Sequence, residues 1–305
     1  MPEDQGVNGD IWNDEASILF QKLGWTTVGD ANIDVKTTEE DFRGLDRMLK
    51  YSDAVRHGSM QGFFLEAKRY KTTSYNKNKL EEWINVLNKK LHIIKNSEEF
   101  HSTYPGMEET ILRQGVIVIW FSNIQEYVNY ESTFREHLAK VKLPGKSSSN
   151  TLNKIFVLEN REILRLSSVV DTVQKYNTLN RGELFFYYPS SSRLKNPADI
   201  SKVLSIEYIY SKFILSQSID ESGKEYYVVF YFGTLNLDSF KRLQSALYSF
   251  GYIHKFKPLT IYTYQRDDEF RKVRPDVESL FAEVTFNLEE MELFSDLPTF
   301  LKKKN

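Results

Sequence analysis

The segment 62–71, "GFFLEAKRYK", begins as an apolar run and ends in alternating charged residues. Such a run is typical of a buried β-strand, in which positions two apart point to the same face. Glu66 and Lys68 therefore share one face, and Ala67 points to the other. The pair is either an ion pair at a solvated strand end or half of a metal-dependent hydrolytic site. The flanking sequence has to distinguish these two interpretations.

The segments before this strand supply two more acids. Apolar residues in 11–23 have helical spacing, and we expect Asp10 to cap this helix and Gly24 to end it. Glu15 lies at the inward edge of the apolar stripe, where a carboxylate needs a partner, a proton or a metal ion. An exposed position on the helix is the alternative.

A second strand and its connection come next. Residues 45–51 predict a short strand that starts near Asp46, although Asp46 is also a typical turn residue. Residues 52–61 then predict a turn or a longer hairpin connection into the strand at 62–71. Adjacent antiparallel strands would bring Asp46 and Glu66 within reach of one ion.

The segments that follow predict a mixed α/β domain. An amphipathic helix is expected at 80–95, a strand buried on both faces at 115–122, a helix at about 127–141 and a strand at 154–159. The loop "PGKSSSN" lies between the last two elements, and an extra strand is possible within the polar stretch near 25–35.

The acids and the lysine form a set that suits phosphodiester hydrolysis. A hard divalent cation needs two or three oxygen ligands and open positions for water and phosphate. A positive charge near the attacking water or the developing negative charge assists the reaction. Asp46, Glu66, Lys68 and Glu15 would supply that set.

The order of these elements resembles the PD-(D/E)xK nuclease superfamily, which has the restriction-endonuclease-like fold. The matching pieces lie within about 10–160 and include "NDEASILFQKLGW", "GLDRML" and "FFLEAKRY". The resemblance implies an α/β fold with a mixed sheet flanked by helices. It also implies a nuclease that uses Mg²⁺ or Mn²⁺.

The resemblance assigns roles position by position. Asp46, Glu66 and the backbone carbonyl of Ala67 would hold the metal ion, Lys68 would be the catalytic lysine, and Glu15 would join the metal or water network. Two features depart from the family pattern: Leu45 stands before Asp46 in place of proline, and Glu66 follows Asp46 by twenty positions. Asp53 would replace Asp46 if the strand register were shifted.

Charge is unevenly distributed along a chain whose net charge is −2. Residues 1–46 hold three basic residues against eleven acidic ones, whereas residues 50–95 hold ten basic against four acidic. A basic stretch beside an acidic cluster suits a polyanion next to a cation site, and an uneven solvated surface is the alternative. The residues predicted to contact nucleic acid are Arg69, Tyr70, Lys71, Lys77 and Lys79.

The second half of the chain has a different composition. Aromatic and β-branched runs occupy 182–189, 205–217 and 224–233, and they are followed by a helix at 237–252 and a strand at 259–265. These patterns predict an α+β module built on an antiparallel sheet. We therefore divide the chain into a nuclease domain at 1–165 and a module at 166–305. The aromatic richness of this module favours a role in interaction or regulation.

Several classes of protein are disfavoured. The chain has no cysteine, which rules out disulfides and thiolate chemistry and fits a reducing cytoplasm. It has no long apolar run and no basic start before an apolar segment, so neither a membrane span nor a secretory signal is expected. Its histidines form no close pair for zinc.

These observations favour a cytoplasmic, prokaryotic, magnesium-dependent endodeoxyribonuclease. The resemblance implies an effector of an antiphage defence or restriction system, with DNA as substrate. A homo- or hetero-oligomer with a controlling subunit is the expected assembly. The main alternative is a non-catalytic subunit that keeps the nuclease fold and binds nucleic acid or a partner. Cleavage of structured RNA remains open because the chemistry is shared.

Overall fold

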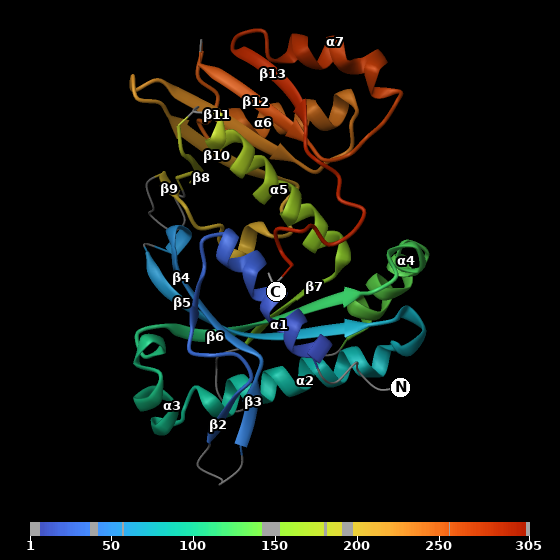
Figure 1. The fold of residues 1–305 in the computed structure, drawn as a ribbon. Helices are drawn as coiled ribbons and strands as arrows, with labels where there is room; N and C mark the ends of the chain where they lie inside the picture. Colours follow the sequence, from blue (N-terminus) through green and yellow to red (C-terminus); the bar gives the residue numbers. More distant parts are fainter. Residues whose placement is uncertain are drawn as a thin grey trace. The chain divides into compact units, whose positions relative to one another are not determined.

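The computed structural model describes residues 7–36, 42–56, 58–141, 153–179, 182–190, 198–255 and 257–302 (Figure 1). The chain forms two compact units. The first unit comprises Met1–Ser52, Ser59–Leu164 and Ser295–Asn305, and the second comprises Asp53–Gly58 and Arg165–Phe294. Two short segments, 53–58 and 295–305, thus group with the unit that their sequence neighbours do not join.

The first unit is built on a five-stranded sheet in the order β1-β4-β5-β6-β7. Strands β5, β6 and β7 run parallel, whereas β1 pairs with β4 in antiparallel fashion. The predicted mixed sheet is therefore confirmed. Its strands are β1 (Thr26–Val28), β4 (Arg47–Asp53), β5 (Ser59–Tyr70), β6 (Ile111–Phe121) and β7 (Lys154–Leu158), and a separate antiparallel pair consists of β2 (Ile33–Lys36) and β3 (Phe42–Leu45).

Helices cover both faces of this sheet (Figure 1). They are α1 (Val7–Lys22), α2 (Lys77–Ile94), α3 (Glu98–Thr103), α4 (Ile124–Lys140) and the first residues of α5 (Asn160–Thr178). Short 3-10 helices are η1 (Ala54–Arg56) in the second unit and η2 (Thr72–Ser74) and η3 (Pro105–Met107) in the first. Helix α2 begins three residues before its predicted start, at a cap in which the Asn76 side chain accepts a hydrogen bond from Lys79 N at 3.0 Å.

The alternation of β5 decides which helix meets which side chain. Phe64 and Tyr70 share a core with the apolar stripe of α2, whereas the Phe63 ring lies 4.6 Å from that of Trp25, which follows α1. Glu66 has the same parity as Phe64, so it points to the α2 face. Helix α1 and helix α2 therefore lie on opposite faces of the sheet, as Figure 1 shows.

Gly115 lets α2 approach the sheet closely. A Cβ at this position in β6 would lie 2.6 Å from Leu87 Cδ2, closer than side-chain atoms pack. The predicted strand at 115–122 is confirmed over 115–121. It begins four residues earlier than predicted, at Ile111, because the glycine lies inside the strand and does not bound it.

Element boundaries near the N-terminus differ from the predictions. Helix α1 starts at Val7, so Asp10 lies inside the helix and is not its cap, whereas Gly24 ends it with a φ of 88° as expected. Three short strands lie where only one was considered, since polar strands of three or four residues carry little alternating signal. The predicted loop "PGKSSSN" lies outside the described residues.

The second unit contains a six-stranded sheet in the order β13-β12-β11-β10-β8-β9. The predicted antiparallel sheet needs correction, because β11, β12 and β13 are parallel to one another. Helices α6 (Leu237–Ser249) and α7 (Phe270–Leu280) make the crossovers that parallel strands require. The strands are β8 (Leu184–Tyr188), β9 (Asp199–Ser201), β10 (Phe213–Ile219), β11 (Glu225–Tyr231), β12 (Pro258–Thr263) and β13 (Thr285–Glu290), and η4 (Ile206–Tyr208) precedes β10.

The aromatic residues of the second unit mainly build its core. Phe230, Tyr231, Phe240 and Tyr252 are all buried. The Tyr252 hydroxyl donates to Val228 O at 2.9 Å and accepts from Val228 N at 3.1 Å, which ties it to the sheet. Aromatic richness therefore reports a packed sheet and does not by itself support an interaction surface.

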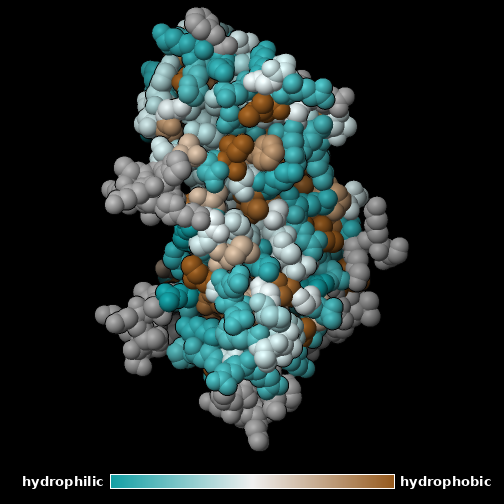
Figure 2. Space-filling view, turned by 90° about the vertical axis from the view of Figure 1, so that its left-hand side faces the viewer, coloured by the Kyte–Doolittle hydropathy of each residue, from teal (hydrophilic) through white to brown (hydrophobic). Residues whose placement is uncertain are grey.

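Hydrophilic residues predominate on the face of the molecule that Figure 2 shows, and hydrophobic residues lie there in small separate groups. Within the described ranges, no helix combines the length and the apolar character that crossing a membrane demands.

Candidate active site

Glu66 and Lys68 lie side by side on β5, as the strand alternation predicts. The Lys68 Nζ atom is 3.3 Å from Glu66 Oε2 and 3.8 Å from Asp46 Oδ2. The Glu66 side chain is only 6% exposed, and that of Lys68 is 15% exposed. This is more than a solvated ion pair at a strand end, because one half-buried ammonium joins two carboxylates.

Asp46 is held in place by the backbone of β5. It lies in the bend between β3 and β4, and its Oδ2 accepts a hydrogen bond from Ala67 N at 2.7 Å. Its Oδ1 makes no polar contact with any described residue, so this oxygen is available to a ligand. The two carboxylates and the neighbouring strand backbone thus meet where the sequence predicted.

A second lysine reaches the same carboxylate from the other side. Lys90 of α2 contacts Glu66 Oε1 with its Nζ atom, and its side chain is 14% exposed. Lys90 was not among the residues predicted for the site. Its position between Leu87 and Leu91, at the margin of the buried stripe of α2, could have indicated that it lies near the sheet.

The surroundings of Asp46 disfavour the ionised form of its carboxyl group. Burial first and the nearby Glu66 second raise the pKa of Asp46 to about 6, whereas Lys68, Ala67 N and Lys90 oppose the rise. Asp46 and Glu66 supply carboxylate oxygens, the ligands that a hard cation prefers, and Asp46 Oδ1 has no partner among the described residues. The residues present therefore fit Mg²⁺ or Mn²⁺, and the two ammonium groups occupy positions where positive charge is favoured.

Glu15 is placed differently from the other acids. It is buried on α1, the helix that packs on the Phe63 face of the sheet, whereas Glu66 points to the α2 face. In the part of the chain that the structure describes, no three histidine, aspartate or glutamate side chains come together as a cation site. A role for Glu15 at the metal site stays a prediction without support from this geometry.

The alternative aspartate, Asp53, has a different environment. It is fully buried, and its Oδ1 accepts from Ser205 Oγ at 2.8 Å and from Val55 N at 3.0 Å, while Arg56 pairs with its other oxygen at 3.1 Å. These contacts lie within the second unit and satisfy the carboxylate. Asp46, not Asp53, therefore accompanies Glu66.

The residues predicted to contact nucleic acid lie in different environments. Tyr70 is buried in the core, where its ring lies 4.9 Å from that of Trp83, so the structure does not support stacking on bases. Lys77 forms an ion pair of 3.0 Å with Glu81. The Lys79 Nζ atom lies 5.5 Å from the centre of the Tyr70 ring. Arg69 is half-buried and Lys71 is exposed.

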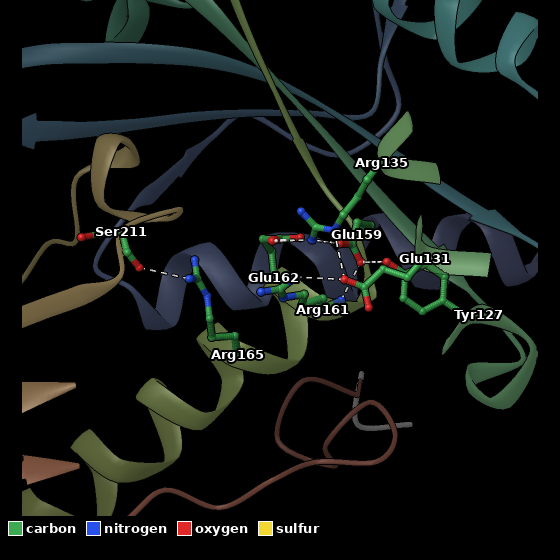
Figure 3. A network of polar contacts seen from close by, with 8 residues as sticks. All are labelled: Tyr127, Glu131, Arg135, Glu159, Arg161, Glu162, Arg165 and Ser211. Carbon is green, nitrogen blue, oxygen red and sulfur yellow. Dashed lines mark hydrogen bonds and ion pairs between the residues drawn. The ribbon is translucent and has the colours of Figure 1, made fainter. Parts of the chain in front are cut away.

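Another buried carboxylate pair lies at the end of β7 (Figure 3). Arg135 of α4 donates to Glu159 at 2.7 Å and to Glu162 at 3.1 Å, and the Tyr127 hydroxyl donates to Glu159. Glu131 accepts from Arg135 at 3.0 Å, which extends the set to the surface. We call these five residues the α4 network.

The proton balance of the α4 network differs from that of an ordinary ion pair. Burial and the hydrogen bond and charge of Glu162 raise the pKa of Glu159 to about 8. Arg135 stays charged, because Glu162 and Glu159 raise its pKa even though burial opposes this. Glu159 therefore holds a proton at neutral pH, and the Arg135 guanidinium lies between it and Glu162.

Comparison with known proteins gives one finding for the first unit. Residues 1–162 match the family model described as the GAPS4 protein PD-(D/E)XK nuclease domain. No curated protein and no solved structure matches the chain.

Proposed function

The chain belongs to the GAPS4 PD-(D/E)XK nuclease domain family, and we propose that this nuclease hydrolyses DNA phosphodiester bonds with Mg²⁺ held by Asp46 and Glu66 and with Lys68 as the catalytic lysine. One observation carries the proposal. A single half-buried ammonium, Lys68 Nζ, contacts both carboxylates, and Asp46 accepts a hydrogen bond from the backbone N–H of Ala67. A cluster that served only to stabilise the strand end would have no need of a carboxylate oxygen without a partner.

The residues that would hold the cation follow from their oxygens. Asp46 offers Oδ1, Glu66 offers a carboxylate that now lies against two lysines, and the carbonyl of Ala67 is the third candidate. A bound Mg²⁺ or Mn²⁺ supplies positive charge to a nonbridging phosphate oxygen and makes a water molecule more acidic. Glu66 must give up or share one ammonium partner when the cation binds.

Lys68 has the most direct chemical role. Its ammonium has three donors, and the two carboxylates fix its position. It can orient the attacking water with one N–H, and another can stabilise the charge that develops on the phosphate. Water oxygen then bonds to phosphorus, and the bond from phosphorus to the leaving oxygen breaks.

The remaining assignments are also part of the proposal. Arg69, Lys71, Lys77 and Lys79 would contact phosphates of the substrate, whereas buried Tyr70 would not take part. The resemblance to defence nucleases supports a role in a prokaryotic antiphage or restriction system. The corresponding assembly combines this chain with a controlling subunit, and residues 166–305 act as the regulatory module.

The test uses the purified full-length chain with supercoiled DNA, linear DNA and structured RNA. Each substrate is incubated with Mg²⁺, with Mn²⁺ or with EDTA, and Lys68→Ala and Lys89→Ala are assayed in parallel. We expect cation-dependent DNA cleavage that Lys68→Ala abolishes. Lys89→Ala, a change at an exposed lysine of α2, is the matched control and should leave cleavage intact.

Other outcomes discriminate between the alternatives. Cleavage of RNA alone would change the substrate but keep the site. Absence of cleavage together with Mn²⁺ binding that Asp46→Ala removes would indicate a missing partner. Absence of both cleavage and Mn²⁺ binding would show that the chain is a binding subunit. The two lysines would then serve only to neutralise the charge of Glu66.

A further inference from the structure

The first unit contains an open cavity away from the candidate active site. It has a volume of about 470 Å³ and lies between the end of α2, helix α3 and the start of β6, which Figure 1 shows next to one another. Its polar lining consists of His92, Lys95, Asn96, His101, Thr110 and Arg113. We propose that this cavity binds the phosphoryl group of a nucleotide or of a nucleic-acid backbone.

The lining has an excess of positive charge. Lys95 and Arg113 both line the cavity, and its lining includes no carboxylate. Neither residue has an ion-pair partner in the described ranges, whereas Arg47, Arg56 and Arg135 each pair with an acid. Burial and the charge of Arg113 lower the pKa of Lys95, which shows that the two cations repel each other. An anion between them would relieve that repulsion.

The hydrogen-bonding groups of the lining are partly fixed. His101 Nε2 lies 2.9 Å from the carbonyl oxygen of Lys95, which orients the ring, while its Nδ1 is buried and has no partner among the described residues. The Asn96 side chain donates to His92 O at 3.0 Å, and Thr110 donates to Met107 O at 2.7 Å. The lining is therefore held in place before a ligand binds, which lowers the cost of binding.

The chemistry of the lining favours phosphate over other anions. A guanidinium presents several donors in a planar fork, and an ammonium and an imidazole N–H add donors from other directions. Together they suit a tetrahedral group with several acceptor oxygens. The cavity is in the size range of small-ligand sites, and Ile111, which is 43% exposed, adds an apolar wall next to the charged groups.

The cavity is separate from the cluster at Glu66. Ile117 of β6 pairs with Glu66, and Ile111 lies six positions earlier on the same strand, or about 20 Å at 3.3 Å per residue. The ligand is thus either a remote backbone phosphate of the substrate, which rests on the proposed function, or a free nucleotide.

The test measures binding to the full-length chain in EDTA, so that it does not depend on cleavage. The probes are inorganic phosphate, AMP and a twelve-nucleotide single-stranded DNA, and titration calorimetry gives each affinity. We expect the double variant Lys95→Gln, Arg113→Gln to bind the responsive probe at least about tenfold more weakly. The single variants should give intermediate losses, and Lys89→Gln should bind as the wild type does.

A second readout locates the bound group. Phosphate or AMP should shift the histidine ring signals of His92 and His101 in NMR spectra but not those of His137 or His254, which contact Tyr75 and Tyr227 instead. A response to DNA alone would identify a backbone phosphate, and a response to AMP a nucleotide site. Unchanged binding by the folded double variant, or absence of binding for all three probes, would overturn the proposal.

Discussion

Two sets of buried carboxylates lie in the first unit, and they are satisfied in different ways. In the β5 cluster, which we define as Asp46, Glu66, Lys68 and Lys90, two lysines contact Glu66, and one oxygen of Asp46 has no partner in the described part of the chain. In the α4 network, Arg135 and the Tyr127 hydroxyl bind Glu159 directly, and Glu162 shares the guanidinium. Arginine forms fixed, planar contacts, whereas a lysine ammonium on a flexible stem is more easily displaced.

This difference separates a cluster that can take a ligand from one that is complete. In the α4 network the Arg135 guanidinium already lies between Glu159 and Glu162, so a cation would have to displace it. In the β5 cluster, Asp46 Oδ1 has no partner among the described residues, and two lysine ammonium groups contact Glu66. The first arrangement ties α4 to the end of β7, and the second supports chemistry.

The largest expected effect is on catalysis in the β5 cluster. Glu66→Gln keeps the shape of the side chain but removes a charged ligand, and cleavage should fall on the order of 10³-fold, the equivalent of several kcal/mol. The initial rate of plasmid cleavage at saturating Mg²⁺ measures it. Glu159→Gln, the same change in the α4 network, should leave that rate within about twofold. Equal losses in both variants would remove the distinction between the two sets.

The next effect is on stability and belongs to the α4 network. Arg135→Met leaves Glu159 and Glu162 buried without their guanidinium, which should lower the free energy of unfolding by about 2–3 kcal/mol. All four tryptophans, at 12, 25, 83 and 120, lie in the first unit, so their fluorescence during urea unfolding reports on this unit. Lys140→Met, at an exposed pair, is the control, with an expected change below about 0.5 kcal/mol. A loss no larger than this control would contradict the assignment.

A smaller effect is a dependence of stability on pH. Glutamate titrates near 4.3 in an unfolded chain, whereas burial and Glu162 raise the pKa of Glu159 to about 8 in the fold. The stabilisation from the protonated form is complete below about pH 4 and is lost as the pH rises through about 8. Relative to Glu159→Gln, the wild type should lose about 2 kcal/mol between pH 6 and 8. Urea unfolding at several pH values tests this, and parallel curves for the two proteins would refute it.

The smallest expected effect concerns the affinity of the β5 cluster for a cation. Lys90→Met removes a positive charge that competes for Glu66, so Mn²⁺ should bind several-fold more tightly, or by about 1 kcal/mol. Calorimetry without substrate measures this, with Lys89→Met as the control. Weaker binding in Lys90→Met would instead show that Lys90 is needed to keep Glu66 in a ligating position.

Local spacing was enough to predict part of this molecule. The i, i+2 relation between Glu66 and Lys68 depends only on strand geometry, and the stripe of α2 depends only on helical periodicity. Asp46 was found because a short connection brings β4 back beside β5. Asp10 was assigned to the wrong position, because a good capping residue type inside a longer helix looks the same in sequence as a true cap.

By itself, the sequence determined which side chains share a strand face or a helix stripe, because those periodicities are set by the chain's own backbone. Only the tertiary structure decided that Lys90 reaches Glu66 and that α1, with Glu15, packs on the other face. The same holds for the parallel half of the second sheet and for the meeting of Lys95 with Arg113. These features depend on how separate elements pack. Local sequence patterns do not specify the distances between elements that are far apart in the chain.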